Sequence, residues 1–190
     1  MKKISILLVA AVVAFSSFKA LENWKLDKGH SQLNFSVTHL GISDVSGVFK
    51  TFDATIKAEK PDFSDAVIEL SADVASINTG IEMRDKHLKG ADFFDVEKYP
   101  TLNFISTGLT NVGKNKYKLT GNLTLHGVTK PVTFDLLYRG TIAHPQSKAP
   151  VSGFQVTGTI KRTDFGIASG FPTTMLSDEV NIKADGEFGK

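Results

Sequence analysis

Apolar and polar residues alternate along most of this 190-residue chain, and the alternation restricts the folds it can adopt. Successive residues of a β-strand point to opposite faces, so a period of two predicts strands with one buried face. In the clearest run, one face carries the apolar residues Ala66, Ile68, Leu70, Ala72 and Val74. Short connections such as 113–115 indicate antiparallel neighbours. The chain is therefore predicted to be an all-β protein.

Similar alternating runs recur to the end of the chain, and one of them changes phase. The other long runs cover residues 32–40, 117–125, 132–138, 154–160 and 180–188. Between residues 45 and 58 the phase slips, which predicts a bulge or sharp bend near Lys50 and Thr51, as in a sheet that curls closed. Glycines within strands, among them Gly121 and Gly158, fit the same need for coiling. With short runs at 24–26 and 102–104, the pattern predicts a barrel of about eight to nine strands.

One segment, near residues 79–95, departs from the alternation. Thr79-Gly80-Ile81-Glu82 has the pattern of a capping box, and Gly90 is a plausible helix stop. The sequence therefore predicts a single short helix over residues 81–89, placed between two strands where it would cover one mouth of the barrel.

The first 20 residues have the pattern of a secretory signal peptide: two lysines, an apolar run and small residues near the end. The remaining residues, 21–190, form one predicted domain. The whole chain has 22 basic and 20 acidic residues, and the signal peptide contains three lysines and no acid. The mature charge is then about −1, which argues against a nucleic-acid partner. A periplasmic or secreted location is expected.

Few residue patterns point to chemistry. There is no cysteine, and no metal-binding spacing relates the five histidines, which are His30, His39, His87, His126 and His144. No arrangement typical of a nucleophilic hydrolase is present. No metal, cofactor or catalytic residue is predicted. An enzyme acting on a lipid head group, with His30, Asp85 or His87 as acid or base, stays an alternative.

Phenylalanine dominates the aromatic residues, with 14 Phe against 3 Tyr and 1 Trp. Several of these rings lie on the apolar strand faces, so the inner face of the barrel is predicted to be dry. A small barrel either fills itself with side chains or holds one elongated ligand, and alternation leaves both possibilities open. An outer-membrane barrel is a further alternative, although such barrels carry girdles of Tyr and Trp that this composition hardly supplies.

Five sequence blocks, in order along the chain, resemble the signatures of the YceI-like family of lipocalin-like polyisoprenoid-binding proteins. They are DKGHSQLNFSVTH at 27–39, GVFKTF at 47–52, RDKHL at 84–88 with FFD at 93–95 and YP at 99–100, GNLTLHGVTKP at 121–131, and RTDFG at 162–166. The resemblance implies an eight-stranded antiparallel lipocalin-like barrel. It also implies a non-catalytic binding or carrier protein for a polyprenyl lipid or an isoprenoid quinone in the bacterial cell envelope, without stable membrane insertion. A homodimer is left open.

Under this interpretation the apolar strand faces line the ligand site. The predicted lining residues are Leu33, Phe35, Val37, Phe104, Leu123, Phe134, Phe154 and Val156. Arg84, Asp85 and His87, on the predicted helix, are candidates for the mouth, where a polar head group would lie. Their alternative role is a salt-bridged clamp that holds the helix against the barrel.

Overall fold

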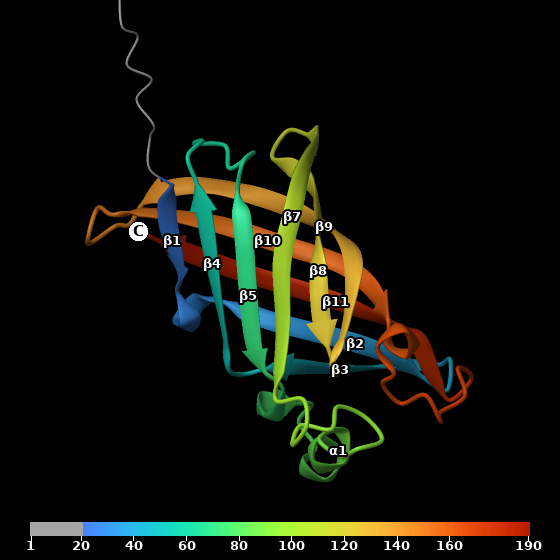
Figure 1. Ribbon diagram of the computed structural model, residues 1–190. Coiled ribbons are helices and arrows are strands. Elements are labelled where there is room, and N and C mark those ends of the chain that lie inside the picture. The colour runs from blue at the N-terminus through green and yellow to red at the C-terminus, as the bar shows by residue number, and fades with distance from the viewer. Residues whose placement is uncertain (1–20) are drawn as a thin grey trace, which may run out of the picture.

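The structure is a computed structural model that describes residues 21–190, so the predicted signal peptide lies outside the described residues. This part of the chain is dominated by one antiparallel sheet (Figure 1). Its strands are β1 (Glu22–Leu26), β2 (Gln32–His39), β3 (Ser43–Phe49), β4 (Phe52–Ala58), β5 (Val67–Asp73), β6 (Ile77–Asn78), β7 (Thr101–Gly113), β8 (Lys116–Leu125), β9 (Val128–Ala143), β10 (Pro150–Lys161) and β11 (Leu176–Gly189). The described residues also form one helix, α1 (Glu82–Leu88), and the 3-10 turns η1 (Lys28–His30), η2 (Val74–Ser76) and η3 (Arg162–Phe165).

The sheet closes into a barrel because β1 and β2 both pair with β11, and the consecutive strands β1 and β2, β3 and β4, and β5 and β6 each form one bent strand. β11 pairs along one edge with β10, and along the other edge with β1 and β2 in turn. β1 pairs onward with β4, β2 with β3, and β5 and β6 pair with β4 and β3. Counting each bent strand once, the closed ring has eight strand positions. The predicted eight-stranded antiparallel barrel is confirmed.

The bend between β3 and β4 lies at Lys50 and Thr51, where the sequence alternation slips. Phe49 before the bend and Ala54 and Ile56 after it are all buried. Because the alternation slips by one residue between β3 and β4, a straight continuation of the strand would turn the apolar side chains of β4 to the outer face. The bend turns them inward again. The predicted change of direction is therefore confirmed, and its effect is to keep one apolar face turned inward.

A cluster of aromatic rings fills the end of the barrel that carries β1 and the C-terminus. We call it the aromatic plug, and it consists of Trp24, Phe63, Tyr138, Phe154 and Phe188. The Phe63 ring lies 5.3 Å from Trp24, 5.1 Å from Tyr138 and 4.9 Å from Phe154, measured between ring centroids. Phe154 also meets Phe188 edge to face at 5.7 Å. This half of the interior is a solid core.

Helix α1 is one residue shorter at each end than predicted and lies beyond the ends of β5 and β7 (Figure 1). The capping box predicted between Thr79 and Glu82 is wrong about the acid. Asp85, rather than Glu82, accepts hydrogen bonds from the Thr79 backbone nitrogen at 2.8 Å and from Thr79 Oγ1 at 2.6 Å. The helix begins after Ile81, two residues later than a Thr79 cap requires, so the acid that reaches back lies further along. Within residues 21–190 no helix is long and apolar enough to span a bilayer.

Candidate functional site

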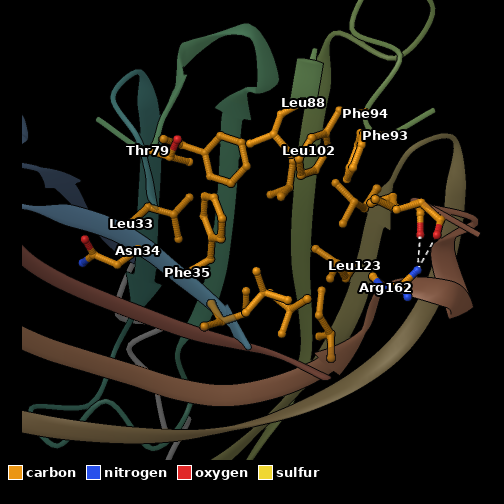
Figure 2. A pocket seen from close by; sticks show the side chains of 18 of the residues that line it. Leu33, Asn34, Phe35, Thr79, Leu88, Phe93, Phe94, Leu102, Leu123 and Arg162 are labelled. Carbon is orange, nitrogen blue, oxygen red and sulfur yellow. Dashed lines mark hydrogen bonds between the residues drawn. The ribbon is translucent and has the colours of Figure 1, made fainter. Parts of the chain in front are cut away.

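The half of the barrel opposite the aromatic plug contains a cavity of about 420 Å³. This volume falls in the range of about 300–1,000 Å³ that is typical of small-molecule sites. Figure 2 shows Leu33 and Phe35 of β2 on one side of the space and Leu123 of β8 on the other. Most of the lining is aliphatic or aromatic, and the polar residues that line it are Asn34, His39, Thr79, Arg84, His87 and Arg162. None of the lining residues described is acidic.

Most of the predicted lining positions border this cavity. The structure brings together Leu33, Phe35, Val37, Phe104, Leu123, Phe134 and Val156. These residues come from β2, β7, β8, β9 and β10, and they meet because a closed barrel turns the inward face of every strand toward one axis. Whether they bind a ligand stays a prediction.

Phe154 has a different place. It is 5% exposed and packs in the aromatic plug, stacked on Tyr138 at 5.3 Å and edge to face on Phe63. It points inward, as the alternation predicts, but at a level of the barrel that is already filled. The structure therefore does not place Phe154 among the residues that line the cavity.

Arg84 and His87 of α1 both line the cavity at the helix side. Arg84 is half-buried, and its guanidinium donates through Nε to Thr79 Oγ1 at 2.7 Å and through Nη2 to the Thr79 carbonyl at 2.8 Å. Nη1 takes part in neither bond. His87 is exposed, and its ring lies 4.8 Å from that of Phe93 and 6.4 Å from that of Phe171. The two side chains thus give an otherwise apolar cavity a polar edge.

Asp85 does not line the cavity, and it is 8% exposed. Burial raises the pKa of its carboxyl group, but the hydrogen bonds from Thr79 and the positive charge of Arg84 outweigh burial and leave the pKa below its usual value. Asp85 is therefore a structural anchor at the start of the helix. The sequence suggested a salt-bridged clamp between the helix and the barrel. In the structure Arg84 and Asp85 instead both form hydrogen bonds with Thr79, and no direct ion pair joins them.

Arg162 lines the cavity, and sequence reasoning did not identify it as a site residue. It follows β10 at the start of η3 and is only 3% exposed. Its five N–H groups donate to five backbone carbonyls at 2.5–3.2 Å, those of Ile167, Ala168, Phe171, Leu176 and Ser177. A guanidinium has five donors, so none is left for a ligand. Arg162 positions the 167–177 segment that walls one side of the cavity. The only sequence signal was its place in the RTDFG block.

His30 is the one histidine that the described structure joins to two acids. Ligand-type atoms of Asp27, His30 and Glu187 lie within 4.8 Å of one another, and all three residues are exposed. Asp27 already accepts hydrogen bonds from the Gly29 backbone and from the His30 ring, each at 2.9 Å. Asp27 caps η1, His30 ends it and Glu187 belongs to β11, and none of the three lines the cavity.

A closed eight-stranded barrel, solid at one end and hollow at the other, has the lipocalin-like architecture. A family model described as the YceI-like domain matches residues 24–188. The chain belongs to the YceI-like family, as its sequence blocks predict.

Comparison with individual proteins agrees with this assignment. A UPF0312 protein of Pseudomonas putida is 38% identical over 167 residues, which is 86% of this chain and 85% of that protein. The crystal structure of BcnA from Burkholderia cenocepacia aligns with a TM-score of 0.76 and 28% identity, covering 85% of this chain and 98% of that one. A domain of Saccharophagus degradans described as polyisoprenoid-binding has the same fold, with a TM-score of 0.66 and 19% identity over 87% of this chain and 97% of that one.

Proposed function

We propose that this protein binds, without chemical turnover, an amphiphile with a long isoprenoid tail, such as a polyprenyl lipid or an isoprenoid quinone. The observation that carries the proposal is the apolar cavity, closed at one end by the aromatic plug and edged with polar groups near α1. Burial of each methylene group contributes about 0.8 kcal/mol, so an apolar lining can hold such a tail without charged contacts. The description of the S. degradans domain as polyisoprenoid-binding supports the same ligand class.

The outer faces of the strands favour an internal ligand over membrane insertion. They carry charged pairs, among them Lys57 with Glu69 at 3.3 Å and Lys118 with Asp135 at 2.6 Å. A membrane-spanning barrel presents an apolar band outward instead. The proposed location is the cell envelope, on the evidence of the N-terminal 20 residues, and release of the protein by osmotic shock would test it.

The proposal is tested by asking what the purified protein carries. We expect native mass spectrometry and organic extraction to reveal a bound lipid, or an emptied sample to take up an added isoprenoid quinone. The mass of the bound molecule should be the same before and after incubation, because turnover is not expected. A protein that contains no lipid and takes up neither quinones nor prenols would refute the proposal, and a changed mass would favour the enzyme alternative.

Arg84→Ala should weaken binding of a quinone but not of squalene, an isoprenoid hydrocarbon without a polar group. The Arg84 guanidinium has an unused Nη1 at the polar edge, and hydrogen bonds to charged groups contribute about 1.5–3 kcal/mol. The quinone affinity should therefore fall about tenfold or more. Isothermal titration of both ligands measures this difference.

Lys86→Ala is the matched control, because Lys86 is an exposed cation on the same helix. It should leave both affinities unchanged. If Arg84→Ala weakens quinone and squalene equally, Arg84 acts through Thr79 and the helix, and the head-group role is wrong.

A further inference from the structure

Three glycines inside strands lie directly beneath phenylalanine rings that line the cavity. A Cβ atom at each of these glycines would lie 2.4 Å from the nearest ring atom. The pairs are Gly47 with Phe35, Gly121 with Phe104, and Gly158 with Phe134, and we call them the ring–glycine pairs. Each joins neighbouring strands: β3 with β2, β8 with β7, and β10 with β9.

The missing side chain decides where each ring lies. Carbon atoms pack at about 3.5–4.0 Å, so a ring atom at 2.4 Å is compatible only with glycine. The ring can therefore lie down against the wall of the barrel and leave the axis open. Any side chain at the glycine would push the ring off the wall, and the space on its free side is the cavity.

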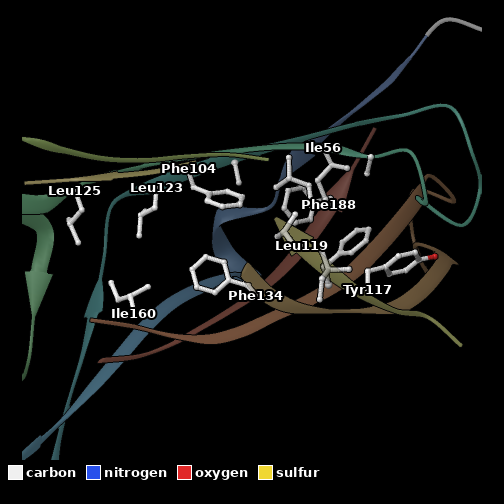
Figure 3. Close-up of a cluster of buried hydrophobic side chains, with 14 of the residues drawn as sticks. Ile56, Phe104, Tyr117, Leu119, Leu123, Leu125, Phe134, Ile160 and Phe188 are labelled. Atoms are coloured by element: carbon white, nitrogen blue, oxygen red, sulfur yellow. The ribbon is translucent and has the colours of Figure 1, made fainter. Parts of the chain in front are cut away.

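Two of the pairs lie where the cavity meets the solid core. Phe104 and Phe134 are 6% and 7% exposed, and their ring centroids are 5.8 Å apart. Figure 3 shows the two rings between Leu123 on one side and Phe188 of the aromatic plug on the other. Both rings line the cavity, so together they form its floor.

We propose that the ring–glycine pairs set the bore and depth of the cavity, and so determine the longest isoprenoid tail that the protein accepts. This inference rests on the proposed function, because it concerns the same cavity. It also assigns the strand glycines a role beyond the coiling expected from the sequence. Gly158 is the most specific of the three, because its three nearest atoms, at 2.4, 3.2 and 3.4 Å, all belong to the Phe134 ring.

Gly158→Ala tests the inference with a series of prenols of increasing length: geraniol, farnesol, geranylgeraniol and solanesol. The added methyl group should push the Phe134 ring into the cavity. For the longest prenol that the unaltered protein retains, we expect affinity to fall about tenfold or more, since overpacking of this size typically has an effect of that order. Shorter prenols should bind within about twofold of the original affinity. Titration with native mass spectrometry gives both values.

Gly153→Ala on the same strand is the matched control. A Cβ atom there would lie 3.5 Å from Cβ of Arg139, an ordinary contact, so binding of the whole prenol series should not change. The double variant Gly158→Ala with Phe134→Leu removes the displaced ring and should recover the longest prenol.

The outcomes separate the two proposals. If the unaltered protein binds no prenol or quinone, the proposed function fails. If it binds them and Gly158→Ala retains the full length preference, the ring–glycine pairs do not set it. Should Gly158→Ala fail to fold, Phe134→Leu alone decides: we expect it to accept a longer prenol than the unaltered protein, and an unchanged limit would overturn the inference.

Discussion

Replacing Phe35 with aspartate is expected to abolish uptake of isoprenoid lipids while the barrel stays folded. Phe35 is half-buried on β2, lines the cavity, and lies 5.7 Å from the ring of Phe49. In the empty protein a carboxylate at this position keeps contact with water. A bound tail would remove that water, and an unpaired buried charge costs several kcal/mol. The affinity for a quinone should therefore fall about 100-fold or more.

Uptake is measured by titration, and folding by thermal unfolding followed with circular dichroism. Ser36→Asp is the control, because Ser36 is the next residue of β2 and alternates to its other face. It should retain full uptake. Equal uptake by Phe35→Asp and Ser36→Asp would contradict the cavity as the binding site.

The same substitution at Phe154 should act on stability instead. Phe154 is enclosed by Phe63, Tyr138 and Phe188, so a carboxylate there has no water in any state of the folded protein. We expect the free energy of unfolding to fall by at least about 3 kcal/mol, as for loss of a buried aromatic ring. A stable Phe154→Asp variant would show that this end of the barrel is not solid.

Arg162→Ala is expected to be the most destabilising change next to the cavity. The substitution removes a donor from five carbonyl groups, of which that of Ala168 keeps its bond from the Phe171 backbone nitrogen. Each buried group that is left unpaired costs about 1–3 kcal/mol. Water can reach some of them once the 167–177 segment moves, so we expect a loss of about 3–5 kcal/mol, as when one partner of a buried charged group is removed. Urea denaturation measures the loss. Hydrogen exchange should also speed up at the Ile167 and Ala168 amides.

Arg162→Lys separates charge from geometry. A lysine keeps the charge but has three donors, so it should recover only part of the stability. Lys161→Ala, at the exposed residue just before, should change stability by less than about 0.5 kcal/mol. If the free energy of unfolding of Arg162→Ala lies within about 1 kcal/mol of that of the original protein, the five hydrogen bonds do not hold the 167–177 segment.

The strands and the bend at Lys50 and Thr51 were predictable because alternation is a local property. A period of two marks the inward face of each strand without reference to any partner. The helix was predictable for the same reason, within one residue at each end. Its cap was not, because the spacing of a capping box is met by Glu82 alone, whereas the helix begins only after Ile81 and Asp85 is the acid that reaches back to Thr79.

The role of Arg162 could not be predicted from the sequence. Its partners are backbone carbonyls of the segment 167–177, and every residue has a carbonyl whatever its side chain. A buried arginine whose hydrogen bonds all go to backbone carbonyls has no partner side chain that a sequence pattern could identify.

Alternation by itself determined that this chain forms strands with one apolar, phenylalanine-rich face each, because successive residues of a strand point to opposite faces. Only the tertiary structure decided which part of the barrel interior is full and which is hollow. Phe134 and Phe154 occupy equivalent positions in their alternating runs. Phe154 meets Phe63, which comes from the connection between β4 and β5, whereas Phe134 lies down over Gly158 of the neighbouring strand. Alternation tells which way a ring points, but how far the ring reaches across the barrel depends on the residue it meets there.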